Sequence, residues 1–262
     1  MACGVDPDKN TIYLQSENLY HANLSWVLEC TTYMGEASRM TQYKDKSSKG
    51  ENVTVGLFTY PILMAADILL YDADYVPVGI DQKQHVELAR DIALRFNKTY
   101  GDTFKMPEPM MSEVGVKIMD LQEPTKKMSK SDETYKGVIL LLDDEKTIIK
   151  KIMSAVTDSD NKIYYDKDNK PGVSNLLTIY SSLKNISIEE AEDYFKDYNY
   201  GNFKKEVADL VVSVLSNIQT KYNEIINGTM LDDILDKGRE KTCEIAKEKT
   251  LDVFRKVGLG RN

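Results

Sequence analysis

One mainly apolar segment, residues 56–71, carries a single charged side chain, Asp67. If the segment is helical, Tyr60, Met64 and Tyr71 lie on the same face as this carboxylate. A carboxylate among apolar neighbours is costly unless a donor reaches it. Aromatic rings, a thioether and one acceptor would suit an aromatic ligand that offers a single N–H or O–H. Pairing of Asp67 with an arginine or a backbone amide in a core is an equally open interpretation of this segment alone.

A second candidate site follows the apolar run at residues 75–78, where Gly79 precedes a polar stretch. A glycine at this point lets a ligand approach the backbone, and a following helix N-terminus favours polar or anionic groups. Asp81 could bond a ribose hydroxyl, or it could simply cap the helix. We interpret His85 as a structural histidine near the helix start.

A third candidate site is the stretch at residues 124–132, which is rich in lysine and serine and includes Lys127, Ser129, Lys130 and Ser131. Ammonium and hydroxyl groups on a loop suit a polyphosphate and can stabilise charge that grows on a leaving pyrophosphate. A solvated surface loop is the simpler alternative. The sequence contains no GxxxxGK[ST] motif, so a P-loop is excluded.

The elements that must position these residues can be read from periodicity. We expect a strand at 11–15, and after Ser16 a helix with an inner stripe of Leu19, Ala22, Trp26 and Cys30. Pro61 would open a helix over 62–71. The strand at 75–78 would lead into a helix ending near Asn97, capped by Asp81 and Gln84, with His85, Ala89, Ile92 and Phe96 along one stripe.

The second half of the chain reads as helical. We expect helices at 143–156, 172–183, 187–198, 202–227 and 230–257. The first 140 residues therefore have mixed α/β character, and the alternation of strand, glycine turn and helix is typical of nucleotide-binding folds.

Composition limits the class of protein. The 262 residues include 34 Lys+Arg and 42 Asp+Glu, a net charge of −8, and 42% hydrophobic residues, which excludes disorder, collagen and coiled coil. Three scattered cysteines indicate reduced thiols, and two histidines exclude a His-rich metal centre. The acidic balance argues against broad nucleic-acid binding but leaves room for a local basic patch. The sequence contains no run of about 18 apolar residues, so it predicts no membrane-spanning helix.

Residues 127–131, KMSKS, match a signature of class I aminoacyl-tRNA synthetases. Together with 59–71, 76–85, 40–44, 154–159 and the Gly-Leu-Gly-Arg at 258–261, they make nearly the whole chain resemble the tryptophan–tRNA ligases. This resemblance implies an α/β Rossmann-like catalytic fold, truncated at its N-terminus, followed by an all-α domain. It also implies a catalytic domain over 1–142 with a dimer-interface insertion, a connection over 143–171, and a helical anticodon-binding domain over 172–262.

The resemblance also implies roles for single residues. Asp67 would accept the indole N–H of tryptophan. The tryptophan site would comprise Asp67, Tyr60, Met64, Gln42, Val76 and Val78. The ATP site would comprise Gly79, Ile80, Asp81, Gln82, Ile118, Lys127, Met128, Ser129, Lys130 and Ser131, of which Lys127, Lys130 and Ser131 would be catalytic.

The implied reaction is attack of the tryptophan carboxylate on the ATP α-phosphate, with Mg²⁺ at the phosphates, and then transfer to the tryptophan tRNA. The partners would be this tRNA, tryptophan, ATP and a second copy of the chain, with residues 11–50 helping to form the interface. We expect a cytoplasmic protein that uses no membrane, no metal ligands of its own and no covalent enzyme intermediate.

The sequence departs from the family in one respect, because neither histidine lies in a HIGH-like motif. In the family that motif precedes the matched region, so we expect the chain to lack a first β-α-β portion and to be poorly stable and inactive alone. Three alternatives remain: a tyrosine–tRNA ligase, a non-catalytic protein that retains the amino-acid or tRNA surface, and a plain α/β scaffold without a nucleotide site.

Overall fold

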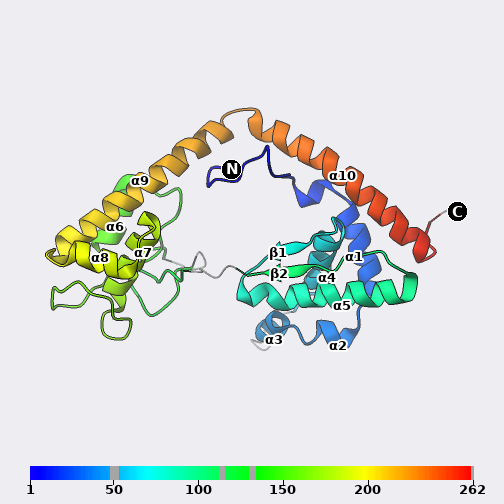
Figure 1. The fold of residues 1–262 in the computed structure, drawn as a ribbon, viewed down its shortest axis with the longest axis horizontal. Helices are drawn as coiled ribbons and strands as arrows, with labels where there is room; N and C mark the ends of the chain where they lie inside the picture. The colour runs from blue at the N-terminus through cyan, green and yellow to red at the C-terminus, as the bar shows by residue number, and fades with distance from the viewer. Residues whose placement is uncertain (48–52, 112–115, 130–133, 261–262) are drawn as a thin grey trace. The chain divides into compact units, whose positions relative to one another are not determined.

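The computed structural model describes residues 1–47, 53–111, 116–129 and 134–260, which form two compact units (Figure 1). Unit 1 contains residues 1–5 and 114–229, and unit 2 contains residues 6–113 and 230–262. The last helix belongs to unit 2, where it packs on the first α-helix. The functional domains expected with limits at 142 and 172 stay a prediction. In the part of the chain that is described, no helix is long and apolar enough to cross a membrane.

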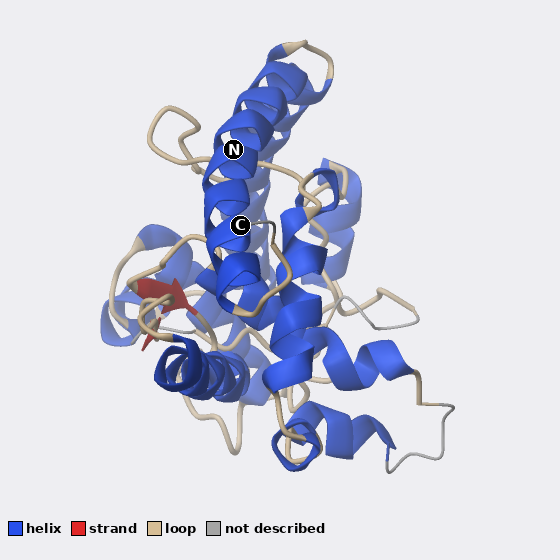
Figure 2. Ribbon diagram, turned by 90° about the vertical axis from the view of Figure 1, so that its right-hand side faces the viewer, coloured by secondary structure: helices blue, strands red, loops and turns tan. Residues whose placement is uncertain are grey.

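Unit 2 is mainly helical, with one small sheet. Its elements are η1 (Gln15–Glu17), α1 (Tyr20–Thr31), α2 (Met34–Ala37), α3 (Thr41–Ser47), α4 (Val55–Leu69), β1 (Tyr75–Pro77), η2 (Ile80–Gln82), α5 (Lys83–Tyr100), β2 (Glu108–Met110) and α10 (Met230–Lys256). α1 and α5 pack on α4, and α10 packs on α1. β1 and β2 are parallel, with Val76 opposite Pro109, and are the short arrows in Figure 2.

The segment at 11–15 is not a strand, so that prediction was wrong. It runs along α10, where the ammonium of Lys241 donates to the hydroxyl of Thr11 at 3.0 Å. Gly238 permits this approach, because a Cβ there would lie 1.9 Å from the carbonyl oxygen of Ile12. A strand needs a backbone partner, and the described sheet contains only β1 and β2.

The inner stripe predicted for α1 was also wrong. Leu19 and Trp26 are 74% and 64% exposed, whereas His21, Leu24 and Leu28 are buried. The helix therefore turns a different face inward, the one from which His21 reaches the carboxylate of Asp67.

α4 begins at Val55, seven residues before the predicted start at 62, because Thr54 caps it by accepting a hydrogen bond from the N–H of Leu57 at 3.3 Å. Pro61 consequently lies inside the helix. The predicted cap of the next helix was wrong as well: α5 begins at Lys83 without a side-chain cap, and Gln84 accepts from the N–H and hydroxyl of Thr41 instead. The predicted buried stripe of α5 is confirmed: His85, Ala89, Ile92 and Phe96 are all buried.

Unit 1 contains α6 (Glu145–Met153), α7 (Pro171–Lys184), α8 (Ile188–Phe195) and α9 (Tyr200–Ile226), close to the predicted helices. α6 packs on α9, and α7 packs on both α8 and α9. Helices are the main regular structure of the described chain (Figure 2).

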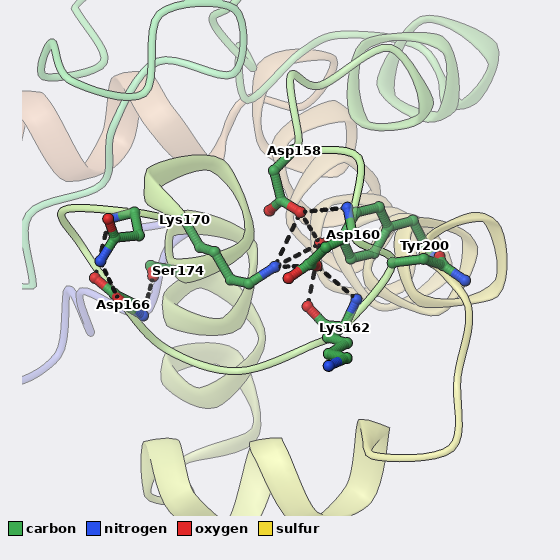
Figure 3. A network of polar contacts seen from close by, with 9 residues as sticks. Asp158, Asp160, Lys162, Asp166, Lys170, Ser174 and Tyr200 are labelled. Atoms are coloured by element: carbon green, nitrogen blue, oxygen red, sulfur yellow. Dashed lines mark hydrogen bonds and ion pairs between the residues drawn. The ribbon is translucent and has the colours of Figure 1, made fainter.

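An ion-pair network around the buried Lys170 ties the loop before α7 to the start of α9 (Figure 3). The ammonium of Lys170, whose side chain is 3% exposed, contacts Asp158 at 2.9 Å, and also Asp160 and the Tyr200 hydroxyl. The Tyr200 hydroxyl donates to Asp158 at 2.6 Å. These bonds hold the pKa of both carboxyl groups below the ordinary value and raise that of Lys170, although burial opposes the shifts at Asp158 and Lys170.

Candidate functional site

Asp67 lies on α4, and its carboxylate is held by two side chains that sequence reasoning missed. The amide of Gln15 donates to both carboxylate oxygens, at 2.7 and 2.8 Å, and Nδ1 of His21 lies 2.6 Å from Oδ1. The alternative partners considered above, an arginine or a backbone amide, are therefore replaced by a glutamine and a histidine. A carboxylate has about four lone-pair directions, so one remains for a further donor, and the side chain is 33% exposed.

His21 links Asp67 to two tyrosines. Its Nε2 lies 2.9 Å from the hydroxyl of Tyr71 and 3.2 Å from that of Tyr13. An Nδ1–H that donates to Asp67 leaves Nε2 as an acceptor for a tyrosine hydroxyl. Burial raises the pKa of Tyr71 and of Tyr13, so both keep the protons that this chain of bonds requires. His21 is one of only two histidines, which is the signal that could have drawn attention to it.

A second hydrogen-bonded group is centred on Tyr60, which precedes Asp67 by about two turns on α4. The hydroxyl of Tyr60 donates to Oε1 of Gln42 at 2.8 Å and lies 2.9 Å from Nε2 of His85. His85 is buried, and its Nδ1 has no hydrogen-bond partner among the residues that the structure describes. Burial lowers the pKa of His85 and raises that of Tyr60, so a neutral imidazole donating from Nε2 and a neutral phenol fit this geometry.

The helix predicted around Asp67 is confirmed for Tyr60, Met64 and Asp67, which are spaced to share one face of α4 and are each partly exposed, whereas Ala65 and Ala66 are fully buried. Tyr71 follows the end of the helix and is partly exposed as well. Of the residues expected around tryptophan, the structure joins Tyr60 to Gln42 by a hydrogen bond, and it places Met64 and Asp67 on the same helix as Tyr60.

The predicted nucleotide residues of unit 2 lie where β1 ends. The N–H of Val78 continues the pairing by donating to the carbonyl of Met110 at 3.1 Å. Gly79 follows, and η2 presents Ile80, which is 79% exposed, with Asp81 beside it. The carboxyl ends of the two parallel strands and the start of α5 thus meet at one exposed edge, the arrangement that α/β proteins use for ligands.

The other predicted nucleotide residues lie in unit 1, on two short antiparallel segments. Met119 pairs with Lys127 as an isolated bridge, and the N–H of Met128 donates to the carbonyl of Ile118 at 3.0 Å. Ile118 and Met128 are half-buried against the core of unit 1, while Lys127 and Ser129 are exposed. Lys130 and Ser131 lie outside the described residues.

Asp120 and Gly137 support this segment pair, and neither was predicted. The buried carboxylate of Asp120 accepts from the N–H groups of Gln122 and Glu123, at 2.7 and 3.0 Å, which shapes the turn between the two segments. A Cβ on Gly137 would lie 1.8 Å from an Asp120 oxygen, so only glycine lets this carboxylate sit there.

Among the residues that the structure describes, no group of three or more His, Cys, Asp or Glu side chains could hold a metal ion.

The family profile described as tRNA synthetases class I (W and Y) matches residues 1–216. The chain is 53% identical over 261 residues to a tryptophan–tRNA ligase of Bacillus anthracis, covering all of this chain and 79% of that protein. It is 54% identical over 265 residues to the tryptophan–tRNA ligase of Malacoplasma penetrans, again covering 79% of that protein.

Solved structures agree with these matches. The tryptophanyl-tRNA synthetase of Mycoplasma pneumoniae superposes with a TM-score of 0.84 at 37% identity, over 99% of this chain and 79% of the other. The enzyme of Campylobacter jejuni, complexed with ADP and tryptophan, gives 0.83 at 38% identity over 98% of this chain and 80% of the other. These neighbours confirm the predicted fold class of a Rossmann-like region followed by helices. The chain therefore belongs to the tryptophan–tRNA ligases, within the class I tRNA synthetases for tryptophan and tyrosine.

Proposed function

We propose that Asp67 of this chain binds the indole N–H of L-tryptophan. The observation that carries the proposal is the fixed carboxylate with one free acceptor direction, held by Gln15 and His21 on a partly exposed face. Tyr60, Met64 and Gln42 are assigned to the same ligand, together with Val76 and Val78 near the end of β1. A fixed acceptor rejects analogues without the donor, since the carboxylate would then lose its partner.

We assign ATP to the residues that follow β1 and to the paired segments of unit 1. Gly79, Ile80, Asp81 and Gln82 are assigned to the adenosine part and Ile118 to the adenine, while Met128 belongs to the run at 127–131 that is assigned to the triphosphate. Lys127, Ser129, Lys130 and Ser131 hold the triphosphate. Lys127 and Ser129 are both exposed residues, which supports this assignment.

The proposed reaction is an in-line attack by the tryptophan carboxylate on the α-phosphate of magnesium-bound ATP. The Cα carboxylate forms the new bond to phosphorus, and pyrophosphate leaves with the electrons of the bond that breaks. The protein contributes position and positive charge rather than a covalent intermediate. The adenylate then passes its aminoacyl group to the tRNA, in the cytoplasm.

The remaining proposals concern partners. The helical residues 172–262 read the anticodon of the tryptophan tRNA, and two copies of the chain form a homodimer through residues 11–50. The exposed apolar side chains of Leu19, Trp26 and Met34 in that region support an interface.

The tryptophan assignment is tested by isothermal titration of the full chain with L-tryptophan and with 1-methyl-L-tryptophan, which lacks the indole N–H. We expect the methyl group to weaken binding by about tenfold or more, the cost of one hydrogen bond to a charged acceptor. In Asp67→Asn, we expect weaker tryptophan binding and a smaller difference between the two ligands.

Asp91→Asn is the matched control, because Asp91 lies on the exposed face of α5 and its loss should leave both affinities unchanged. Equal affinities of the unsubstituted chain for the two ligands would refute the assignment without reference to any variant.

A further inference from the structure

The two antiparallel segments of unit 1, one around Met119 and the other around Lys127, are also hydrogen-bonded by one side chain of a neighbouring helix. Met119 faces Lys127 in the antiparallel bridge, while the bonds run between their neighbours, from Asp120 to Lys126 and from Met128 to Ile118. In such a non-hydrogen-bonded pair the N–H and C=O groups point away from the partner segment. The backbone of Met119 therefore needs partners on its outer side.

Asn175, on α7, supplies both partners. Its Oδ1 accepts from the N–H of Met119 at 2.8 Å, and its Nδ2 donates to the carbonyl of Met119 at 2.8 Å. The side chain is only 3% exposed. One amide thus replaces the third strand that would otherwise continue the ladder. Leu121, the next residue on the same outer side, is bonded to Gly137 and Val156.

We propose that Asn175 is a positioning residue that fixes the backbone of Ile118–Met119 and, through the pairing, that of Lys127 and Met128. The inference rests on the proposed function, which assigns adenine and phosphate contacts to these segments. A side chain at this position must donate one hydrogen bond and accept another to pair with both backbone groups of Met119. The short amide of asparagine does both. Aspartate has the same shape but would set a carboxylate against the carbonyl of Met119.

The test uses the full chain in three forms: unsubstituted, Asn175→Asp, and Val173→Ala as a control. Val173 is a fully buried core residue of the same helix, so its truncation destabilises unit 1 without removing a bond to Met119. Hydrogen exchange is followed in peptides over residues 116–129, and ATP and tryptophan are titrated in parallel.

In Asn175→Asp, we expect exchange of these peptides to accelerate by about tenfold or more and ATP affinity to fall by about tenfold, with tryptophan affinity unchanged. Val173→Ala should leave both quantities within about twofold of the unsubstituted chain. If packing rather than hydrogen bonding mattered, the isosteric aspartate would behave as the unsubstituted chain does, and the proposal would fail.

A second measurement needs no variant. The N–H of Met119 should exchange slowly in the unsubstituted chain, although no strand pairs with it, and rapid exchange there would overturn the proposal. Accelerated exchange in Asn175→Asp with unchanged ATP affinity would also overturn it. Failure of the unsubstituted chain to bind ATP would contradict the proposed function instead, and the exchange data would still decide whether Asn175 fixes the segment.

Discussion

Asp67 could be selected from the sequence because it is the only charged residue in an apolar segment, and the predicted helix around it is present as α4. Its partners could not be found in the same way. Gln15 and His21 precede it by about fifty residues, and which side chains meet across that distance depends on tertiary packing. Asn175 escaped notice for the same reason, since a buried asparagine in a helix carries no local signal.

Lys170 illustrates how much a single buried charge contributes. Lys170→Met would leave Asp158 and Asp160 without their cation, so we expect a loss of about 3 kcal/mol in the stability of unit 1. Thermal or urea unfolding measures this loss. Lys167→Met is the control, since Lys167 is exposed and its substitution should cost little. Equal stability of the two variants would show that the ion pairs do not stabilise the unit.

Among the elements, long helices with a clear apolar stripe were predicted best. α5 buries the stripe that its periodicity predicts, and the helices of unit 1 lie within a few residues of their predicted ends. The wrong predictions concern segments whose residue pattern allows more than one packing arrangement. α1 has enough apolar residues for two inward faces, and the segment at 11–15 has strand-forming residues but runs along α10 instead of pairing.

The start of α5 should make stability depend on pH. Burial lowers the pKa of His85 from its ordinary value of 6.5. As the pH falls below that value the unfolded chain takes up a proton that the folded chain refuses, so folding stability decreases. We expect the unfolding temperature to drop between about pH 7.5 and about pH 5.5, and to drop less in His85→Gln. An identical drop in the variant would assign the effect to other groups.

The segment pair of unit 1 should contribute to nucleotide binding through Lys127. In Lys127→Ala, we expect the affinity for ATP to fall by about tenfold, the effect of removing one charged phosphate contact. Lys126→Ala provides the comparison, because the ammonium of Lys126 pairs with Glu123. ATP titration of both variants would contradict the assignment if they lost affinity equally.

At the scale of the whole molecule, net charge predicted little. A total of −8 argued against nucleic-acid partners, yet the chain belongs to a family of tRNA ligases. The agreement of several motifs in order and spacing was the stronger guide, because each motif alone had a simpler structural explanation. The division into units was not predictable, since only packing shows that α10 returns to α1.

Tryptophan selection by this chain is the central claim, and titration with L-tryptophan and L-tyrosine under identical conditions tests it most directly. We predict saturable binding of L-tryptophan, with L-tyrosine weaker by about tenfold or more. Binding of L-tyrosine as tight as that of L-tryptophan, or no binding of L-tryptophan, would contradict the account.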